Sequence, residues 1–158
     1  GERLPISFAE GDAEAIPFPD GSFDVLLSTF GVMFSADQEQ AAAELRRVCR
    51  PAGRIALANW TPDSFIGQLF RTLGRFIPPA PGVQSPMRWG SEEGLRALFG
   101  ADAAGMRVAR RSFVFRYRSA DHFLEVFRSY YGPTVKAFEA LDGGQQQALA
   151  EAILALLA

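Results

Sequence analysis

The chain has 158 residues, of which 48% are hydrophobic and 22% are charged, and this composition is typical of a soluble globular protein with one core. The formal net charge of −2 gives no overall attraction to nucleic acid or to an anionic membrane, and no apolar run is long enough to predict a membrane span. The single cysteine, Cys49, excludes an internal disulfide and a cysteine-based metal cluster, and it agrees with a cytoplasmic location.

The first sixty residues have the pattern of a βαβ unit. Short apolar runs predict strands at Ile6–Ala9, Val25–Thr29 and Ile55–Trp60. Asp37 is a typical N-cap residue with Gln40 three positions later, so we expect a helix between the second and third of these strands. Strands joined in this way should be parallel, with a right-handed crossover.

Helical spacing predicts which side chains of that first helix are buried. Ala41, Leu45 and Val48 share one face and should pack against the sheet. The charged residues Glu44 and Arg47 are expected to point toward water.

The rest of the chain is predicted to be mostly helical. Residues 61–90 combine a helix, capped by Asp63 or Ser64, with a proline-rich loop, an arrangement typical of a lid over a pocket. Val108–Tyr117 alternates aromatic residues with valine and arginine, which predicts a strand. Residues 119–158 should form further helices, as a C-terminal helical part of a single domain that spans 1–158.

Loops at the carboxyl ends of the strands are the candidate ligand sites, because open α/β sheets bind ligands there. The loops after Ala9, Thr29 and Trp60 meet this condition. In the first of them, the Asp12 carboxylate can accept a hydrogen bond from an exocyclic amine such as that of adenine, and the Ala13 N–H can donate to a ring nitrogen. The alternative is that Asp12 only closes a turn and contacts no ligand.

Three consecutive segments resemble class I S-adenosylmethionine-dependent methyltransferases, of the kind that methylate quinones and other small molecules. These segments are GDAEAIPFPDGSFD at 11–24, VLLSTFGVMF at 25–34 and AELRRVCRPAGRIALANW at 43–60. The resemblance implies a Rossmann-like α/β fold and methyl transfer from the cofactor sulfonium to a small-molecule acceptor. Such a reaction depends on positioning, so the resemblance implies no particular catalytic side chain.

The same resemblance implies roles for individual residues. Asp12 and Ala13 would face the adenine of S-adenosylmethionine, whereas Ser28, Thr29 and Phe30 would line its methionine end, mostly through backbone atoms. Residues 61–90 would shape the acceptor pocket, although simple packing is the alternative for each aromatic side chain there. The acceptor-pocket candidates are Trp60, Phe65, Phe70, Met87 and Trp89.

The chain departs from the family pattern at several points. Ala52 stands where the family usually has a second glycine, and the glycine-rich loop and ribose-binding acid of the family are not found before Asp12. The resemblance therefore implies an incomplete sheet that lacks strands 1 and 2 and the last strand, in an internal piece of a larger protein. We expect such a piece to bind the cofactor poorly by itself. Its bare Val25–Thr29 edge should be covered, either by Ile6–Ala9 or by a second copy in a homodimer.

Other functions remain open from the sequence. One is a non-catalytic interaction module that dimerises through the open edge, and another is a nucleotide-binding enzyme such as a dehydrogenase. Arginines and aromatics in residues 107–118 are compatible with single-stranded nucleic acid, but strand alternation explains the same pattern and the net charge argues against it. The only histidine, His122, should cap or flank a helix rather than catalyse, and no metal-ligand spacing is present.

Overall fold

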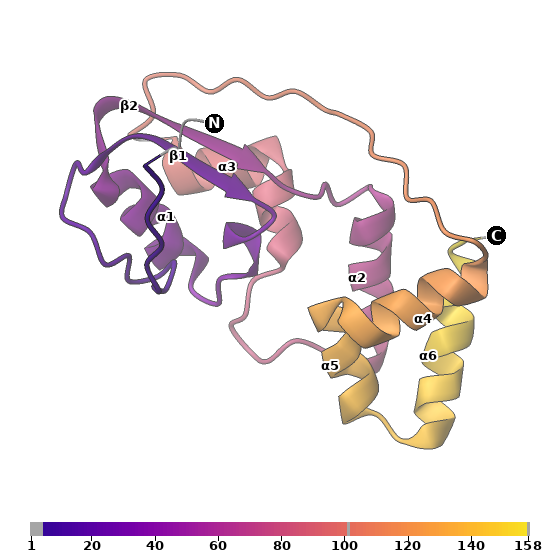
Figure 1. Ribbon diagram of the computed structural model, residues 1–158. Helices are drawn as coiled ribbons and strands as arrows, with labels where there is room; N and C mark the ends of the chain where they lie inside the picture. The colour runs from indigo at the N-terminus through magenta and orange to yellow at the C-terminus, as the bar shows by residue number, and fades with distance from the viewer. Residues whose placement is uncertain (1–4, 101, 158) are drawn as a thin grey trace.

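The N-terminal part of the chain is a small α/β unit in the computed structural model, which describes residues 5–100 and 102–157 (Figure 1). Strands β1 (Phe23–Thr29) and β2 (Cys49–Ala58) form a parallel two-stranded sheet, and helix α1 (Gln38–Val48) connects them. This observation confirms the predicted strand–helix–strand order and the parallel pairing. The register pairs Val25 with Arg54 and runs without interruption to the end of β1.

The Asp37 cap is confirmed, because its carboxylate accepts a hydrogen bond from the Gln40 N–H at 2.9 Å. A short 3-10 helix, η1 (Val32–Phe34), lies between β1 and α1. Helix α1 then buries Ala41 and Val48 completely, so the predicted apolar face is correct.

Two predicted strands are absent from the structure. Ile6–Ala9 forms no strand and leaves Phe8 almost fully exposed, so this segment does not cover the edge of β1. Val108–Tyr117 also forms no strand, and its alternation survives only in part: Phe115 and Tyr117 are half-buried, whereas Phe113 and Val114 are both exposed. Both predictions failed for the same reason. An apolar alternation favours an extended backbone, but a strand also needs a hydrogen-bonded neighbour.

The remaining elements are helices, and most begin at a side chain that caps them. Ser64, Ser91, Ser119 and Asp142 each accept a hydrogen bond from the backbone N–H three residues later. A long segment without helix or strand, residues 103–119, passes from the α/β unit to the C-terminal helices (Figure 1). The elements are α2 (Phe65–Phe76), the 3-10 helix η2 (Pro86–Gly90), α3 (Glu92–Phe99), α4 (Ala120–Tyr130), α5 (Gly132–Ala140) and α6 (Gly143–Ala155).

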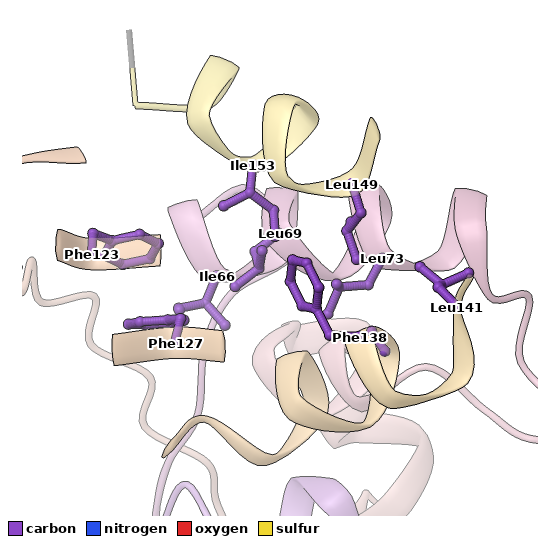
Figure 2. Close-up of a cluster of buried hydrophobic side chains, with 10 residues drawn as sticks. Ile66, Leu69, Leu73, Phe123, Phe127, Phe138, Leu141, Leu149 and Ile153 are labelled. Atoms are coloured by element: carbon purple, nitrogen blue, oxygen red, sulfur yellow. The ribbon is translucent and has the colours of Figure 1, made fainter. Parts of the chain in front are cut away.

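Two clusters of buried side chains stabilise these parts. The sheet-side cluster joins η1, α1, η2 and α3, and includes Met33, Leu45 and Trp89. The helical cluster joins α2 with α4, α5 and α6; Figure 2 shows Leu69 facing Leu149 and Ile153 across this interior. Trp60 and Phe70 pack against both clusters, so they connect the two parts of the chain. Full burial of a leucine or isoleucine side chain contributes about 1.5–3 kcal/mol, so each cluster is a substantial source of stability.

Candidate functional site

The loop before β1 forms a tight turn around Asp12. The Asp12 side chain accepts a hydrogen bond from the Glu14 N–H at 2.9 Å, and its carbonyl accepts one from the Ala15 N–H at 3.1 Å. The turn therefore uses Asp12 in the way that the non-ligand alternative expected. Asp12 is nevertheless exposed, and a carboxylate can accept more than one hydrogen bond, so a ligand amine remains chemically compatible with this position.

A pair of charged side chains on α1 holds the next part of this loop. Glu44 Oε2 accepts the Ile16 N–H at 2.7 Å, and the Arg47 guanidinium donates to the carbonyls of Ile16 and Phe18 at 2.9 and 2.8 Å. Arg47 also pairs with Glu44 at 2.6 Å and with Asp20 at 2.9 Å. The expectation that Glu44 and Arg47 point toward water is therefore wrong: Glu44 is 7% exposed, and Arg47 is half-buried.

The ion pair between Glu44 and Arg47 shifts the pKa of both groups. The hydrogen bond from Arg47 lowers the pKa of Glu44 from 4.5 to about 2, and the Ile16 N–H acts in the same direction. The same pairing with Glu44, followed by Asp20, raises the pKa of Arg47. Both groups are charged across the physiological pH range.

The start of the loop is tied to the beginning of α1. The Glu14 carboxylate accepts the Asp37 N–H at 2.9 Å, and the Gln40 side chain donates to the Glu14 carbonyl at 3.1 Å. Residues 12–20, which we call the clamped loop, are thus fixed against α1 at both ends without belonging to any helix or strand.

The carboxyl end of β1 has an unusual backbone conformation. Phe30 has a φ of +59°, a region that bulky residues rarely adopt, and its N–H still donates to the Ala58 carbonyl at 2.9 Å. Its ring stacks on Trp60 with 4.3 Å between centroids and 15° between planes. Strained residues of this kind concentrate at functional sites. The Ser28 hydroxyl accepts the Val32 N–H at 3.1 Å, and Thr29 is exposed.

The predicted cofactor residues thus lie in two segments that share one support. The clamped loop carries Asp12 and Ala13, and the end of β1 carries Ser28, Thr29 and Phe30. Ile16 and Phe30 pack against the same sheet-side cluster, which links the two segments through apolar contacts.

An apolar pocket lies near the second strand end, where the chain passes into the helical part. Its volume is about 270 Å³. Trp60 is the one predicted acceptor residue that lines it; Met87 and Trp89 are buried in the sheet-side cluster instead. Tyr131 also contributes to the wall, and burial raises the pKa of its hydroxyl to about 12. The lining residues are Trp60, Ile66, Phe115, Tyr117, Val126, Phe127, Tyr130 and Tyr131.

His122 has the structural role that the sequence predicts. Its ring accepts the Arg118 N–H at 3.3 Å, its own N–H donates to Ser119 at 3.1 Å, and it packs edge-on against Tyr117. Within residues 5–100 and 102–157, no group of histidine, cysteine and acidic side chains is arranged to hold a metal ion. Over the same residues, no helix is both long enough and apolar enough to span a membrane.

Residues 1–57 match the family described as "Methyltransferase domain". A demethylmenaquinone methyltransferase of Deinococcus radiodurans is 39% identical over 84 residues, which are 52% of this chain and 35% of that protein. The corresponding enzyme of Thermus thermophilus is 32% identical over 120 residues, covering 72% of this chain and 54% of that protein. The chain is related to the class I S-adenosylmethionine-dependent methyltransferases. The predicted resemblance is confirmed.

Relatives with longer matches carry no functional name. An uncharacterized protein of Mycobacterium tuberculosis is 39% identical over 140 residues, which cover 87% of this chain and 51% of that protein. The chain spans about half the length of these curated relatives. No solved structure matches this chain.

The residues that sequence reasoning missed were present in the helical pattern. Ala41, Glu44, Leu45 and Val48 follow the i, i+3, i+4, i+7 spacing of a buried stripe, so position 44 lies on the apolar face despite its charge. A carboxylate on a buried face needs a partner, and Arg47 lies one turn later. That combination could have predicted a buried ion pair.

Proposed function

We propose that the protein that contains this chain transfers a methyl group from S-adenosylmethionine to a small-molecule acceptor. The main support is the coincidence of the methyltransferase match over residues 1–57 with a parallel β1–α1–β2 unit whose preceding loop is fixed against α1. In this proposal Asp12 and Ala13 receive the adenine, and Ser28, Thr29 and Phe30 lie along the methionine end. The protein contributes positioning and exclusion of water rather than a side-chain nucleophile.

The pocket beside Trp60 is our proposed acceptor site. Its aromatic walls favour a flat, apolar acceptor, which agrees with the demethylmenaquinone methyltransferases among the relatives. The pocket and the strained Phe30 meet at Trp60, because Trp60 lines the pocket and stacks on the Phe30 ring. An acceptor in this pocket would therefore lie next to the proposed methionine end of the cofactor.

We also propose that the 158-residue chain by itself binds the cofactor weakly. The sequence before Asp12 has no glycine-rich loop, and the proposed contacts grip the cofactor only through the clamped loop and the end of β1. A cofactor that is contacted on only part of its surface binds less tightly, so we expect a dissociation constant in the millimolar range.

Amide chemical shifts measured during titration with S-adenosylmethionine test this assignment. We expect perturbations at Asp12, Ala13 and Phe30, and Asp12→Ala should weaken binding. Asp24→Ala is the matched control, because Asp24 is a nearby exposed carboxylate that pairs with Arg50 instead. Absence of any perturbation at these amides would exclude the cofactor assignment, and micromolar affinity by calorimetry would refute weak binding while supporting the site.

A second candidate function has its own observation. Val25 and Leu27, on the face of β1 away from the sheet-side cluster, are 52% and 77% exposed. Apolar strands with a bare face and edge favour association, so a dimerising, non-catalytic module is the alternative proposal. Sedimentation of the chain should then show a dimer that Leu27→Glu dissociates. A wild-type monomer whose Asp12, Ala13 and Phe30 amides do not shift with S-adenosylmethionine would contradict both proposals.

A further inference from the structure

The clamped loop is held by side-chain hydrogen bonds from α1 to which the sequence resemblance assigns no role. Residues 12–20 belong to no helix and no strand, yet their backbone is held by the same two side chains of α1 at several points. We propose that Glu44 and Arg47 are positioning residues that hold this loop so that Asp12 and Ala13 are presented to the adenine; this inference rests on the proposed function.

The geometry of Arg47 fits a clamp better than a simple ion pair. Its guanidinium donates through Nε and both Nη atoms, reaching Glu44, Asp20 and the carbonyls of Ile16 and Phe18. A planar fork with five donors can serve several acceptors in fixed directions, whereas a lysine ammonium cannot reproduce that pattern.

Both polar groups of one loop residue are engaged by this pair. Glu44 accepts the Ile16 N–H, Arg47 takes the Ile16 carbonyl, and the Ile16 side chain packs against the sheet-side cluster. Ile16 lies three residues after Ala13, so fixing it limits where Asp12 and Ala13 can move. The far end of the loop is held as well, because the Gly21 N–H donates to the backbone carbonyl of Arg47.

Arg46 supplies a matched comparison on the same helix. It is adjacent to Arg47 and similarly exposed, but it pairs with Asp102 at 3.1 Å and donates to the Leu98 carbonyl, so it ties α1 to α3 rather than to the loop. Arg46→Met removes an equivalent guanidinium and leaves the clamp untouched. Loss of a general α1 contact and loss of the clamp can therefore be separated.

Amide hydrogen exchange on the whole 158-residue chain tests the clamp without any cofactor. Arg47→Met removes the donor to the Ile16 carbonyl and the charge partner of Glu44, and Glu44→Gln replaces the charged acceptor of the Ile16 N–H by a neutral one. Both changes should accelerate exchange of the Ile16 amide at least about tenfold. Leu149 in α6 is the internal reference and should be unchanged. Arg47→Lys keeps the positive charge but lacks the planar guanidinium, so its Ile16 amide should exchange as fast as in Arg47→Met. In Arg46→Met the Ile16 amide should exchange at the wild-type rate.

Adenosine as a probe then links the clamp to the site. Binding measured from amide shifts at Asp12 and Ala13 should weaken about fivefold in Arg47→Met and stay unchanged in Arg46→Met, because a loose loop must be ordered on binding. Equal Ile16 exchange in the Arg46 and Arg47 variants would overturn the clamp. If Arg47→Met exchanges its Ile16 amide faster but binds adenosine as tightly as the wild type, the positioning role is overturned. If even the wild type shows no adenosine shifts, the proposed function fails and the positioning role fails with it, while the exchange data still decide whether the clamp exists.

Discussion

The α/β unit depends on polar side chains for its loops more than the helical part of this chain does. In the α/β unit, Gln38, Glu44 and Arg47 reach from α1 to loops that have no secondary structure, and they satisfy backbone groups there. In the helical part, the cluster of α2 and α4–α6 is almost entirely apolar, and most polar side chains beside it cap helix ends. Gln146 is the exception, because its amide donates to the carbonyls of Phe138 and Leu141. Helices satisfy their own backbone, so their packing needs only apolar faces.

A ligand loop is held in shape by the rigid element beside it. A loop that presents backbone atoms to a ligand cannot pair them in a sheet, so its remaining groups need side-chain partners from a rigid element. Here α1 is that element: one face packs on the sheet, and the adjoining Glu44 and Arg47 hold the clamped loop.

Truncation of the helical core should have the largest effect on stability. Leu149 is fully buried in the helical cluster, so Leu149→Ala should cost about 2–5 kcal/mol of the free energy of unfolding in urea. Leu157→Ala, at a position 37% exposed, is the control and should change little. Because Trp60 packs against both clusters, tryptophan fluorescence and circular dichroism should report one shifted transition. An unmoved fluorescence transition would show that the two parts unfold independently.

Acid should weaken the α/β unit through Glu44. Its folded-state pKa of about 2 lies below the usual 4.5, so the folded state binds this proton less tightly than the unfolded state. The stabilisation is therefore complete above about pH 4.5 and is lost as the pH falls toward about pH 2. Arg47 is the charged partner that lowers the pKa of Glu44, and Asp20 is the second carboxylate that pairs with Arg47. Urea unfolding should separate wild type from Glu44→Gln near neutrality, and the gap should narrow at about pH 3; a constant gap would contradict the assignment.

Much of the α/β unit could be predicted from the sequence, because its signals are local. The apolar run of β1, the Asp37 cap and the Ala41–Leu45–Val48 spacing each depend on neighbouring residues, and each is correct. Strand pairing is not local. Ile6–Ala9 has a strand-like sequence but no partner in the structure, so it is not a strand.

The candidate site shows the same limit. Sequence resemblance selected Asp12, Ala13 and the end of β1, but contacts across 28 and 31 residues, from Ile16 to Glu44 and Arg47, could not be read from spacing alone. The pocket beside Trp60 also joins residues from distant helices, such as Ile66 and Tyr131, and no single segment encodes it. Charge on an apolar helical stripe is the one local signal that pointed to the clamp.

The register irregularity near the start of β2 offers a smaller and more local test. Ala52 has a φ of +60°, a left-handed conformation that glycine adopts without strain, and the resemblance places a glycine there. Ala52→Gly should therefore stabilise the chain by about 0.5–1 kcal/mol, because relief of this strain exceeds the added entropy of the unfolded chain. Ala56→Gly in extended β2 is the control and should destabilise by a similar amount. Destabilisation by both changes would show that the backbone at Ala52 is unstrained.

The smallest expected change in stability comes from replacing one buried polar side chain in the helical part and one in the α/β unit. The Thr134 hydroxyl is buried in the helical part without a hydrogen-bond partner among the described residues, so Thr134→Val should be neutral or stabilising by up to about 1 kcal/mol. Gln38 is equally buried in the α/β unit, but its amide donates to the carbonyls of Gln84 and Ser85. Gln38→Met keeps the volume and removes a buried Oε1 that has no partner among the described residues, but it leaves two carbonyls without their donor, so it should destabilise. Opposite signs in thermal unfolding of the two variants would establish that buried polar side chains shape loops in the α/β unit and are dispensable in the helical part, whereas equal signs would remove the contrast.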